Sequence, residues 1–207
     1  MTLRSILSLS AVVPVLTIER AQDAAPLARA LLAGGLKVLE VTLRTSAALE
    51  AMARIDGEVE GVVLAAGTVL SPGDLERAAR AGARLAFSPG IADFMLEPQT
   101  IPILPGVATA SEMMKGLEAG LDSFKFFPAV SAGGIGALKA LGGPFPSVAF
   151  CPTGGISLDN AGAFLALANV ACVGGSWVAP KDAVAAGNWA LIEQLSREAA
   201  ALRARRS

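Results

Sequence analysis

Short apolar segments alternate with alanine-rich amphipathic segments along the whole chain, and this alternation limits the possible folds more than any other feature. Apolar runs rich in valine, leucine and alanine are typical of strands that are covered on both faces of a parallel sheet. Eight such runs are present, at residues 12–18, 37–42, 62–66, 85–88, 101–104, 123–127, 148–151 and 171–174. The pattern predicts eight strand–helix units in succession.

The intervals between these runs carry helix start and stop signals. Pro72 stands at the first helical position of one interval, where its missing N–H group costs nothing. Glycine follows the last turn of several intervals and readily adopts the left-handed conformation that ends a helix. Helices are expected at 23–33, 71–81 and 111–119, which end before Gly34, Gly82 and Gly120.

Eight strand–helix units in 207 residues come close to the smallest size of a closed (β/α)8 barrel. We therefore predict an α/β fold, a single-domain TIM barrel that spans residues 1–207 and includes a short N-terminal helix. An open doubly wound sheet is the alternative. In a barrel, polar residues at the carboxyl ends of the strands are candidates for the active site, because enzymes with this fold carry their active sites there.

The composition favours a soluble domain with a large core. Hydrophobic residues make up 53% of the chain, and its formal net charge of −1 gives no electrostatic reason to expect a nucleic-acid partner. No apolar run approaches the roughly 20 residues of a membrane span, so we expect a cytoplasmic protein without a membrane partner. The basic ending at 203–206 is typical of a solvated helix terminus, and Cys151 and Cys172 of small core residues.

Histidine and tyrosine are both absent from the sequence. Zinc hydrolases, Ser-His-Asp nucleophiles and aldolases that polarise a carbonyl through a histidine-bound metal all depend on histidine. We therefore expect no metal site. Proton transfer should rest on Glu, Asp, Lys, Cys or bound water.

Lys125 differs from the other four lysines because it lies in an aromatic strand, DSFKFFP at 122–128. Burial disfavours the charged form of a lysine and leaves a neutral amine that can attack a carbonyl carbon. The residue therefore predicts Schiff-base chemistry. The alternative is an edge lysine whose stem packs on phenylalanine while its amine reaches water.

Side-chain alternation places Glu40 in the same interior as Lys125. In the strand at 37–42, Glu40, Thr42 and the following Arg44 alternate with apolar residues, so their side chains should point into the barrel mouth. The same alternation points Lys125 inward. An interior carboxylate is costly unless it is paired or takes part in proton chemistry. A structural Glu40–Arg44 ion pair is the alternative to a catalytic role.

Glycine-rich turns follow the last two predicted strands. In (β/α)8 enzymes these two loops commonly form a phosphate site, because glycine lets backbone N–H groups approach the anion. A phosphate ester is therefore the expected class of substrate. The predicted phosphate ligands are Gly154, Gly155, Gly174, Gly175 and Ser176.

Six segments that span nearly the whole chain carry motifs: 38–45 (VLEVTLRT), 66–70 (AGTVL), 88–90 (SPG), 124–129 (FKFFPA), 151–156 (CPTGGI) and 174–177 (GGSW). Together they resemble the signature segments of the 2-keto-3-deoxy-6-phosphogluconate aldolase family. The resemblance implies a metal-independent class I aldolase of the Entner–Doudoroff pathway that needs no cofactor. Its substrate would be a phosphorylated sugar acid, which it splits into pyruvate and glyceraldehyde 3-phosphate. Activity toward 4-hydroxy-2-oxoglutarate and a homotrimer are also implied.

Transferred by position, the resemblance makes Lys125 the Schiff-base lysine and Glu40 the residue that shuttles protons. Arg44 would bind the substrate carboxylate through its planar guanidinium. The rest of the pyruvyl pocket would comprise Thr68 and Thr153, through hydroxyl hydrogen bonds, and Pro89 and Phe127, through packing.

One departure from the family pattern lies at 90–100, a segment that is shorter than usual. The fourth helix should therefore be reduced to a turn or two.

Two further functions are open. One is a different enzyme on the same scaffold, either a 2-keto-3-deoxy-6-phosphogalactonate aldolase or an isomerase or epimerase. The segment 42–45 (TLRT), with Arg44, favours the gluconate substrate over the galactonate one. The other function is a non-catalytic phosphate-binding barrel, which would need the glycine loops but no reactive amine.

Overall fold

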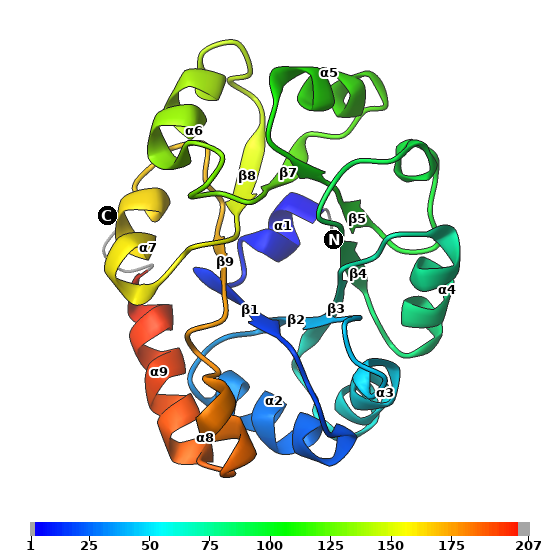
Figure 1. Ribbon diagram of the computed structural model, residues 1–207, viewed down its shortest axis with the longest axis vertical. Helices are drawn as coiled ribbons and strands as arrows, with labels where there is room; N and C mark the ends of the chain where they lie inside the picture. The colour runs from blue at the N-terminus through cyan, green and yellow to red at the C-terminus, as the bar shows by residue number, and fades with distance from the viewer. Residues whose placement is uncertain (1–2, 203–207) are drawn as a thin grey trace.

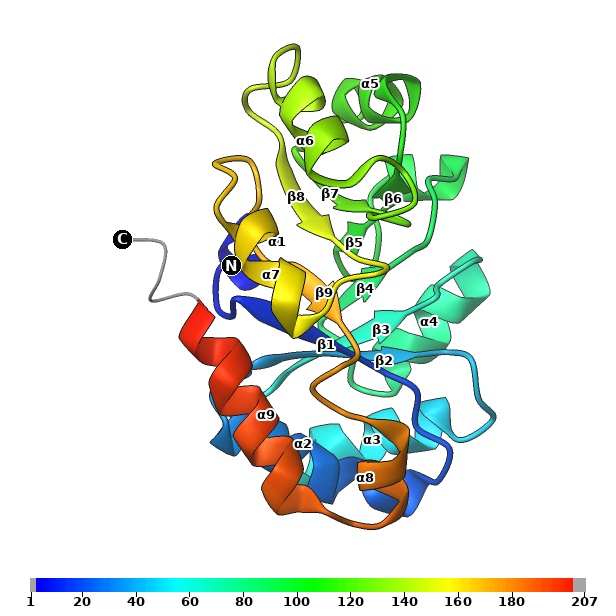
Figure 2. The ribbon, with the colours of Figure 1, turned by 60° about the vertical axis from the view of Figure 1, so that its left-hand side comes forward.

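The computed structural model describes residues 3–202, in which parallel strands run through the middle of the molecule and helices cover them on the outside (Figures 1 and 2). Residues 1–2 and 203–207 lie outside the described residues, and with them the basic ending at 203–206 and the outermost positions of the predicted domain. None of the described helices is long and apolar enough to cross a membrane.

The strands form two parallel sheets. Their bounds are β1 Val12–Leu16, β2 Val38–Thr42, β3 Val63–Gly67, β4 Leu85–Phe87, β5 Ile103–Leu104, β6 Gly106–Val107, β7 Ser123–Phe126, β8 Ala149–Pro152 and β9 Val173–Gly175. The larger sheet has the order β5-β4-β3-β2-β1-β9, and the smaller has the order β6-β7-β8. The predicted parallel pairing is confirmed, and every predicted strand overlaps an observed one.

The fifth predicted strand, 101–104, is wrong in its extent, because Pro105 divides this part of the chain into β5 and β6. Proline has no N–H group to continue a ladder. Its carbonyl oxygen instead accepts a hydrogen bond from the backbone N–H of Lys125, 2.9 Å away. As a result β5 pairs with β4, whereas Gly106 of β6 pairs with Lys125 of β7.

Helices separate most of the strands, as predicted. Their bounds are α1 Leu3–Leu7, η1 Ala21–Asp23, α2 Ala24–Ala33, α3 Ala48–Glu58, α4 Pro72–Arg80, η2 Asp93–Leu96, α5 Ala110–Glu118, α6 Gly134–Gly142, α7 Leu158–Leu165, α8 Lys181–Ala185 and α9 Trp189–Ala201. The short N-terminal helix is α1, and the reduced fourth helix is the single turn η2. The start predicted near Pro72 is confirmed by the Ser71 hydroxyl, which accepts a hydrogen bond from the N–H of Asp74.

Two hydrophobic cores lie on opposite sides of the strands, which confirms the predicted side-chain alternation. The outer core, between strands and helices, includes Leu39, Val41 and Phe124. The inner core lies among the strands and includes Val38, and it also holds the two buried cysteines and Ile6 and Leu7 of α1. Helix α1 therefore fills one end of the strand array (Figure 1).

Candidate active site

Lys125 and Glu40 form a buried pair between β7 and β2. The ammonium nitrogen Nζ of Lys125 lies 2.9 Å from Oε1 and 3.3 Å from Oε2 of Glu40. Only 4% of Lys125 and 1% of Glu40 are exposed. The alternative of a water-exposed edge lysine is therefore wrong. The alternative Glu40–Arg44 ion pair is wrong as well, because the carboxylate faces Lys125.

Aromatic rings and a glycine enclose this pair. Nζ of Lys125 lies 5.4 Å from the ring centre of Phe87 and 5.6 Å from that of Phe127. A Cβ atom on Gly67 would stand 2.3 Å from Oε1 of Glu40. Only glycine at the end of β3 leaves room for the carboxylate in its observed position.

Arg44 and Thr68 meet at the carboxyl ends of β2 and β3. Nε of Arg44 donates a hydrogen bond to the Thr68 hydroxyl oxygen at 3.1 Å. Thr68 has a backbone φ of 59°, in the left-handed region, which costs a β-branched residue on the order of 1–3 kcal/mol. Such strain is typical of functional sites, where the surrounding structure holds a side chain in one place.

The two glycine-rich loops lie side by side after β8 and β9, and an isolated bridge pairs Thr153 with Gly174. Gly154 and Gly155 have φ values of 100° and 77°, which a residue with a side chain rarely adopts. A Cβ on Gly174 would stand 2.2 Å from the Thr153 hydroxyl oxygen. The loops therefore need glycine for backbone conformation and for close packing, independently of any anion.

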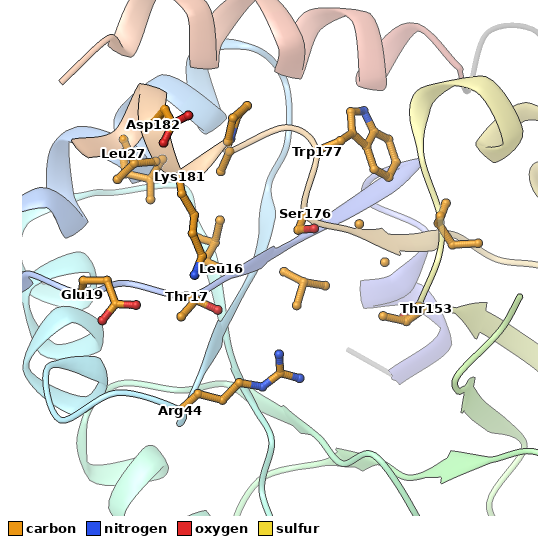
Figure 3. Close-up of a pocket in the computed structure, with 18 of the residues that line it drawn as sticks. Leu16, Thr17, Glu19, Leu27, Arg44, Thr153, Ser176, Trp177, Lys181 and Asp182 are labelled. Atoms are coloured by element: carbon orange, nitrogen blue, oxygen red, sulfur yellow. The ribbon is translucent and has the colours of Figure 1, made fainter. Parts of the chain in front are cut away.

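One cavity of about 940 Å³ brings most of the predicted site residues together (Figure 3). Glu40 and Thr68 are not among its lining residues but bond to Lys125 and Arg44, which are. Pro89 does not line the cavity either; it follows β4, where its backbone lies close to Gly106. The predicted residues that do line it are Arg44, Lys125, Phe127, Thr153, Gly154, Gly155, Gly174, Gly175 and Ser176.

The cavity wall also contains polar residues that were not predicted from the sequence, among them Thr17, Glu19 and Lys181. Thr17 and Glu19 directly follow β1, so the rule that sites collect at the carboxyl ends of strands contained a signal for them. Lys181 begins the short helix that follows the last glycine loop, and its helix-terminal setting gave no such signal. Thr42, which was also predicted to point inward, is not among the lining residues; its hydroxyl group donates a hydrogen bond to the carbonyl oxygen of Leu16 at 2.8 Å.

Comparisons with known proteins agree with this geometry. A family model described as KDPG and KHG aldolase matches residues 3–195. A KHG/KDPG aldolase from Escherichia coli K12 is 50% identical over 198 residues, which cover 94% of this chain and 93% of the relative.

Two solved structures are also similar. One is the KDPG aldolase of Legionella pneumophila, with pyruvate captured as a covalent carbinolamine intermediate. It has a TM-score of 0.94 and 47% identity, and the match covers 97% of this chain and 98% of the other. The other is the 2-keto-3-deoxy-6-phosphogluconate aldolase of Zymomonas mobilis with 3-phosphoglycerate. It has a TM-score of 0.89 and 48% identity, and the match covers 96% of this chain and 94% of the other. The chain therefore belongs to the KDPG and KHG aldolase family.

Proposed function

We propose that Lys125 is the Schiff-base nucleophile of a class I aldolase that cleaves 2-keto-3-deoxy-6-phosphogluconate into pyruvate and glyceraldehyde 3-phosphate. The observation that carries the proposal is the buried Lys125–Glu40 contact of 2.9 Å beside a large cavity. A carboxylate at this distance can take the ammonium proton, which frees the amine. The carbinolamine in the Legionella relative is the species that such an amine forms with pyruvate.

The first half of the reaction forms an iminium ion. The Lys125 nitrogen attacks the C2 carbonyl carbon of the substrate, and the carbonyl oxygen is protonated and leaves as water. Glu40 is within reach of the nitrogen and therefore supplies and removes protons in these steps. The aromatic rings around the pair limit the access of water, which strengthens the electrostatic effect of the carboxylate.

The second half breaks the C3–C4 bond. Glu40 takes the proton of the C4 hydroxyl group, directly or through a water molecule, and C4 becomes the aldehyde carbon of glyceraldehyde 3-phosphate. The electron pair of the broken bond moves to C3 and is delocalised onto the nitrogen as an enamine. Protonation of C3 and hydrolysis of the iminium release pyruvate and regenerate Lys125.

The remaining site residues bind the two ends of the substrate. Arg44, held by Thr68, binds the C1 carboxylate with its planar guanidinium. Thr153 and Phe127 complete the pyruvyl pocket with a hydroxyl group and an aromatic wall. Pro89 acts on this pocket only through packing. The phosphate is bound by the two glycine loops, namely Gly154, Gly155, Gly174, Gly175 and Ser176.

Activity toward 4-hydroxy-2-oxoglutarate is also part of the proposal, because that substrate presents the same 2-oxo acid to Lys125 and Arg44. The galactonate-type aldolase and the non-catalytic barrel are not favoured. The gluconate-type relative from Escherichia coli is 50% identical over most of the chain, and a non-catalytic barrel leaves the buried Lys125–Glu40 pair without a purpose.

The complete fold is expected to be one closed (β/α)8 barrel in a single domain over 1–207. Two observations support closure: only Pro105 separates β5 from β6, and the Thr153–Gly174 bridge joins the end of β8 to β9. A homotrimer in the cytoplasm is the expected setting. Exposed apolar side chains such as Leu70 and Met114, which are 60% and 62% exposed, would favour association. Sedimentation analysis tests the trimer directly.

Borohydride trapping tests the proposal most directly. The protein is incubated with pyruvate and reduced, and the modified residue is located by mass spectrometry. We expect one adduct, on Lys125, and none in Lys125→Ala, which should also lose cleavage. Lys139→Ala changes an exposed lysine of α6 and should retain both adduct and activity. An unmodified Lys125, or cleavage by Lys125→Ala, would overturn the mechanism.

Metal independence is tested separately. Cleavage should be unchanged after treatment with excess EDTA, because the iminium serves as the electron sink. Loss of activity that added divalent metal restores would contradict a class I mechanism for this chain.

A further inference from the structure

The charged side chains around the cavity divide into paired and unpaired groups. Lys125 is paired with Glu40, and Arg20 is paired with Asp23 at 2.8 Å. Arg44 and Lys181 also line the cavity, but neither forms an ion pair with any residue from 3 to 202. Two cations are therefore available to a ligand.

Lys181 lies at the end of the cavity that holds Ser176. The connection between them is short and fixed, because the N–H of Ala179 donates to the Ser176 carbonyl at 3.1 Å and Val178 is fully buried. Figure 3 shows the Lys181 side chain extending from α8 into the cavity on the Thr17 side, whereas the Asp182 carboxylate lies on the far side of the helix turn. The ammonium group is thus presented to the cavity.

We call the end of the cavity with Ser176 and Lys181 its outer end. Two carboxylates at this end make the positive charge of Lys181 important for an anionic ligand. Glu19 and Asp182 line the same wall, and Arg20 is neutralised by Asp23. Lys181 offsets one of these two carboxylates. Without it both negative charges would be uncompensated and would repel a phosphate dianion more strongly. The glycine loops offer backbone N–H groups, which bind phosphate but bring no net charge.

We propose that Lys181 is a further phosphate ligand, which sets the preference of this enzyme for phosphorylated acceptor aldehydes. The inference rests on the proposed aldolase function and adds a residue outside the glycine loops. Arg44 binds the carboxylate at one end of the substrate, and Lys181 binds the phosphate at the other. As a phosphate ligand outside the buried Lys125–Glu40 pair, Lys181 would affect recognition of the phosphorylated half alone.

The test compares two acceptors that differ only in the phosphate. Pyruvate is added to glyceraldehyde 3-phosphate and to glyceraldehyde by the wild-type protein and by Lys181→Ala. We expect kcat/KM for the phosphorylated acceptor to fall about 10- to 100-fold, the usual loss for a hydrogen bond between charged groups. The rate with glyceraldehyde should be unchanged. Inorganic phosphate should inhibit the variant less than the wild type.

Two further variants separate charge from structure. Lys181→Arg keeps a cation and should retain most of the preference, whereas Lys181→Glu should lose more than Lys181→Ala. Lys139→Ala, which removes an exposed lysine outside the cavity, should behave as the wild type with both acceptors. Equal losses with the two acceptors, or no loss in Lys181→Ala, would overturn the inference. If the wild type adds pyruvate to neither acceptor and shows no Lys125 adduct, the aldolase function itself fails.

Discussion

The inner and outer ends of the cavity hold their polar and charged groups in different environments. At the inner end, Lys125 and Glu40 are almost completely buried, project from strands and lie in direct contact. At the outer end, Ser176 and Lys181 are exposed and lie on a loop and a short helix. The proposed reactive groups are thus on the rigid elements, and the proposed phosphate ligands are on the connections.

This difference follows from the cost and strength of charges in each place. Burying an ion pair is expensive, and well-packed apolar residues often stabilise a core more. The inner pair is therefore best explained by chemistry, which needs strong interactions in a dry and preorganised site. At the outer end water screens each contact, so the proposed phosphate recognition would be spread over several weaker contacts. Substitutions at the inner end should change kcat, and those at the outer end should change KM.

The largest effect should come from Glu40→Gln. The amide keeps the shape of the carboxylate but cannot take a proton, so kcat should fall by roughly 10²–10⁴, the range for lost acid/base catalysis. The borohydride adduct of Lys125 should also form more slowly. Glu60→Gln changes an exposed carboxylate and should have no effect. A change in KM alone would place Glu40 with the binding residues and remove the contrast between the two ends.

Gly67→Ala tests whether the position of the inner carboxylate matters. The new Cβ would stand 2.3 Å from Oε1 of Glu40, so the carboxylate must shift. A displacement of about 1 Å can cost on the order of 10² in rate, and we expect kcat to fall by that amount. Gly57→Ala is the control, because a Cβ there meets no atom within 4 Å. Normal turnover in a folded Gly67→Ala protein would show that the inner end tolerates movement.

At the outer end, Ser176→Ala should raise KM for the phosphorylated substrate about 10-fold, the effect of one lost hydrogen bond to a charged group. Because the proposed role of this hydroxyl group is to bind the phosphate and not to transfer protons, kcat should stay the same. Ser131→Ala, at an exposed position after β7, serves as the matched control. A fall in kcat with unchanged KM would contradict the division of roles between the two ends.

The inner end was easier to predict from the sequence than the outer end, for physical reasons. Strand alternation fixes which side chains share an interior, and it correctly placed Glu40 with Lys125. The helix of Lys181 has only five residues, and no periodicity indicates where its first side chain points. Local conformations such as the left-handed Thr68 are equally hidden, because a β-branched residue disfavours them and only the surrounding fold imposes them.

The split of the fifth strand has a similar cause. Pro105 was visible in the sequence as a residue that interrupts a ladder, but the neighbour that each half of the segment pairs with is set by tertiary packing: β5 pairs with β4, whereas β6 pairs with β7. The apolar pattern predicted the presence of a strand there. It carried no information on which sheet each half would join.

Glu112 lies outside both ends of the cavity and shows how much a polar group contributes when it only stabilises the fold. Glu112 accepts hydrogen bonds from the N–H of Ala108 and from the hydroxyl and N–H of Thr109, and so caps α5. We expect Glu112→Gln to lower the free energy of unfolding by about 1 kcal/mol, which lowers Tm by roughly 2–4 °C. Cleavage should be unaffected. Glu118→Gln, at the other end of the same helix, should change neither.

The pH dependence of the stability that Glu112→Gln loses distinguishes an ionised cap from simple packing. Burial alone would raise the pKa of Glu112, but the three hydrogen bonds outweigh burial and hold the pKa below its usual value of 4.5. The folded state binds the proton less readily than the unfolded state. The stabilisation is therefore complete above pH 4.5 and disappears as the pH falls through the lower pKa of the folded state. The Tm difference between the wild type and Glu112→Gln should therefore be full at neutral pH and shrink in acid. A difference that stays constant across this range would mean that Glu112 stabilises α5 through its shape and not through its charge.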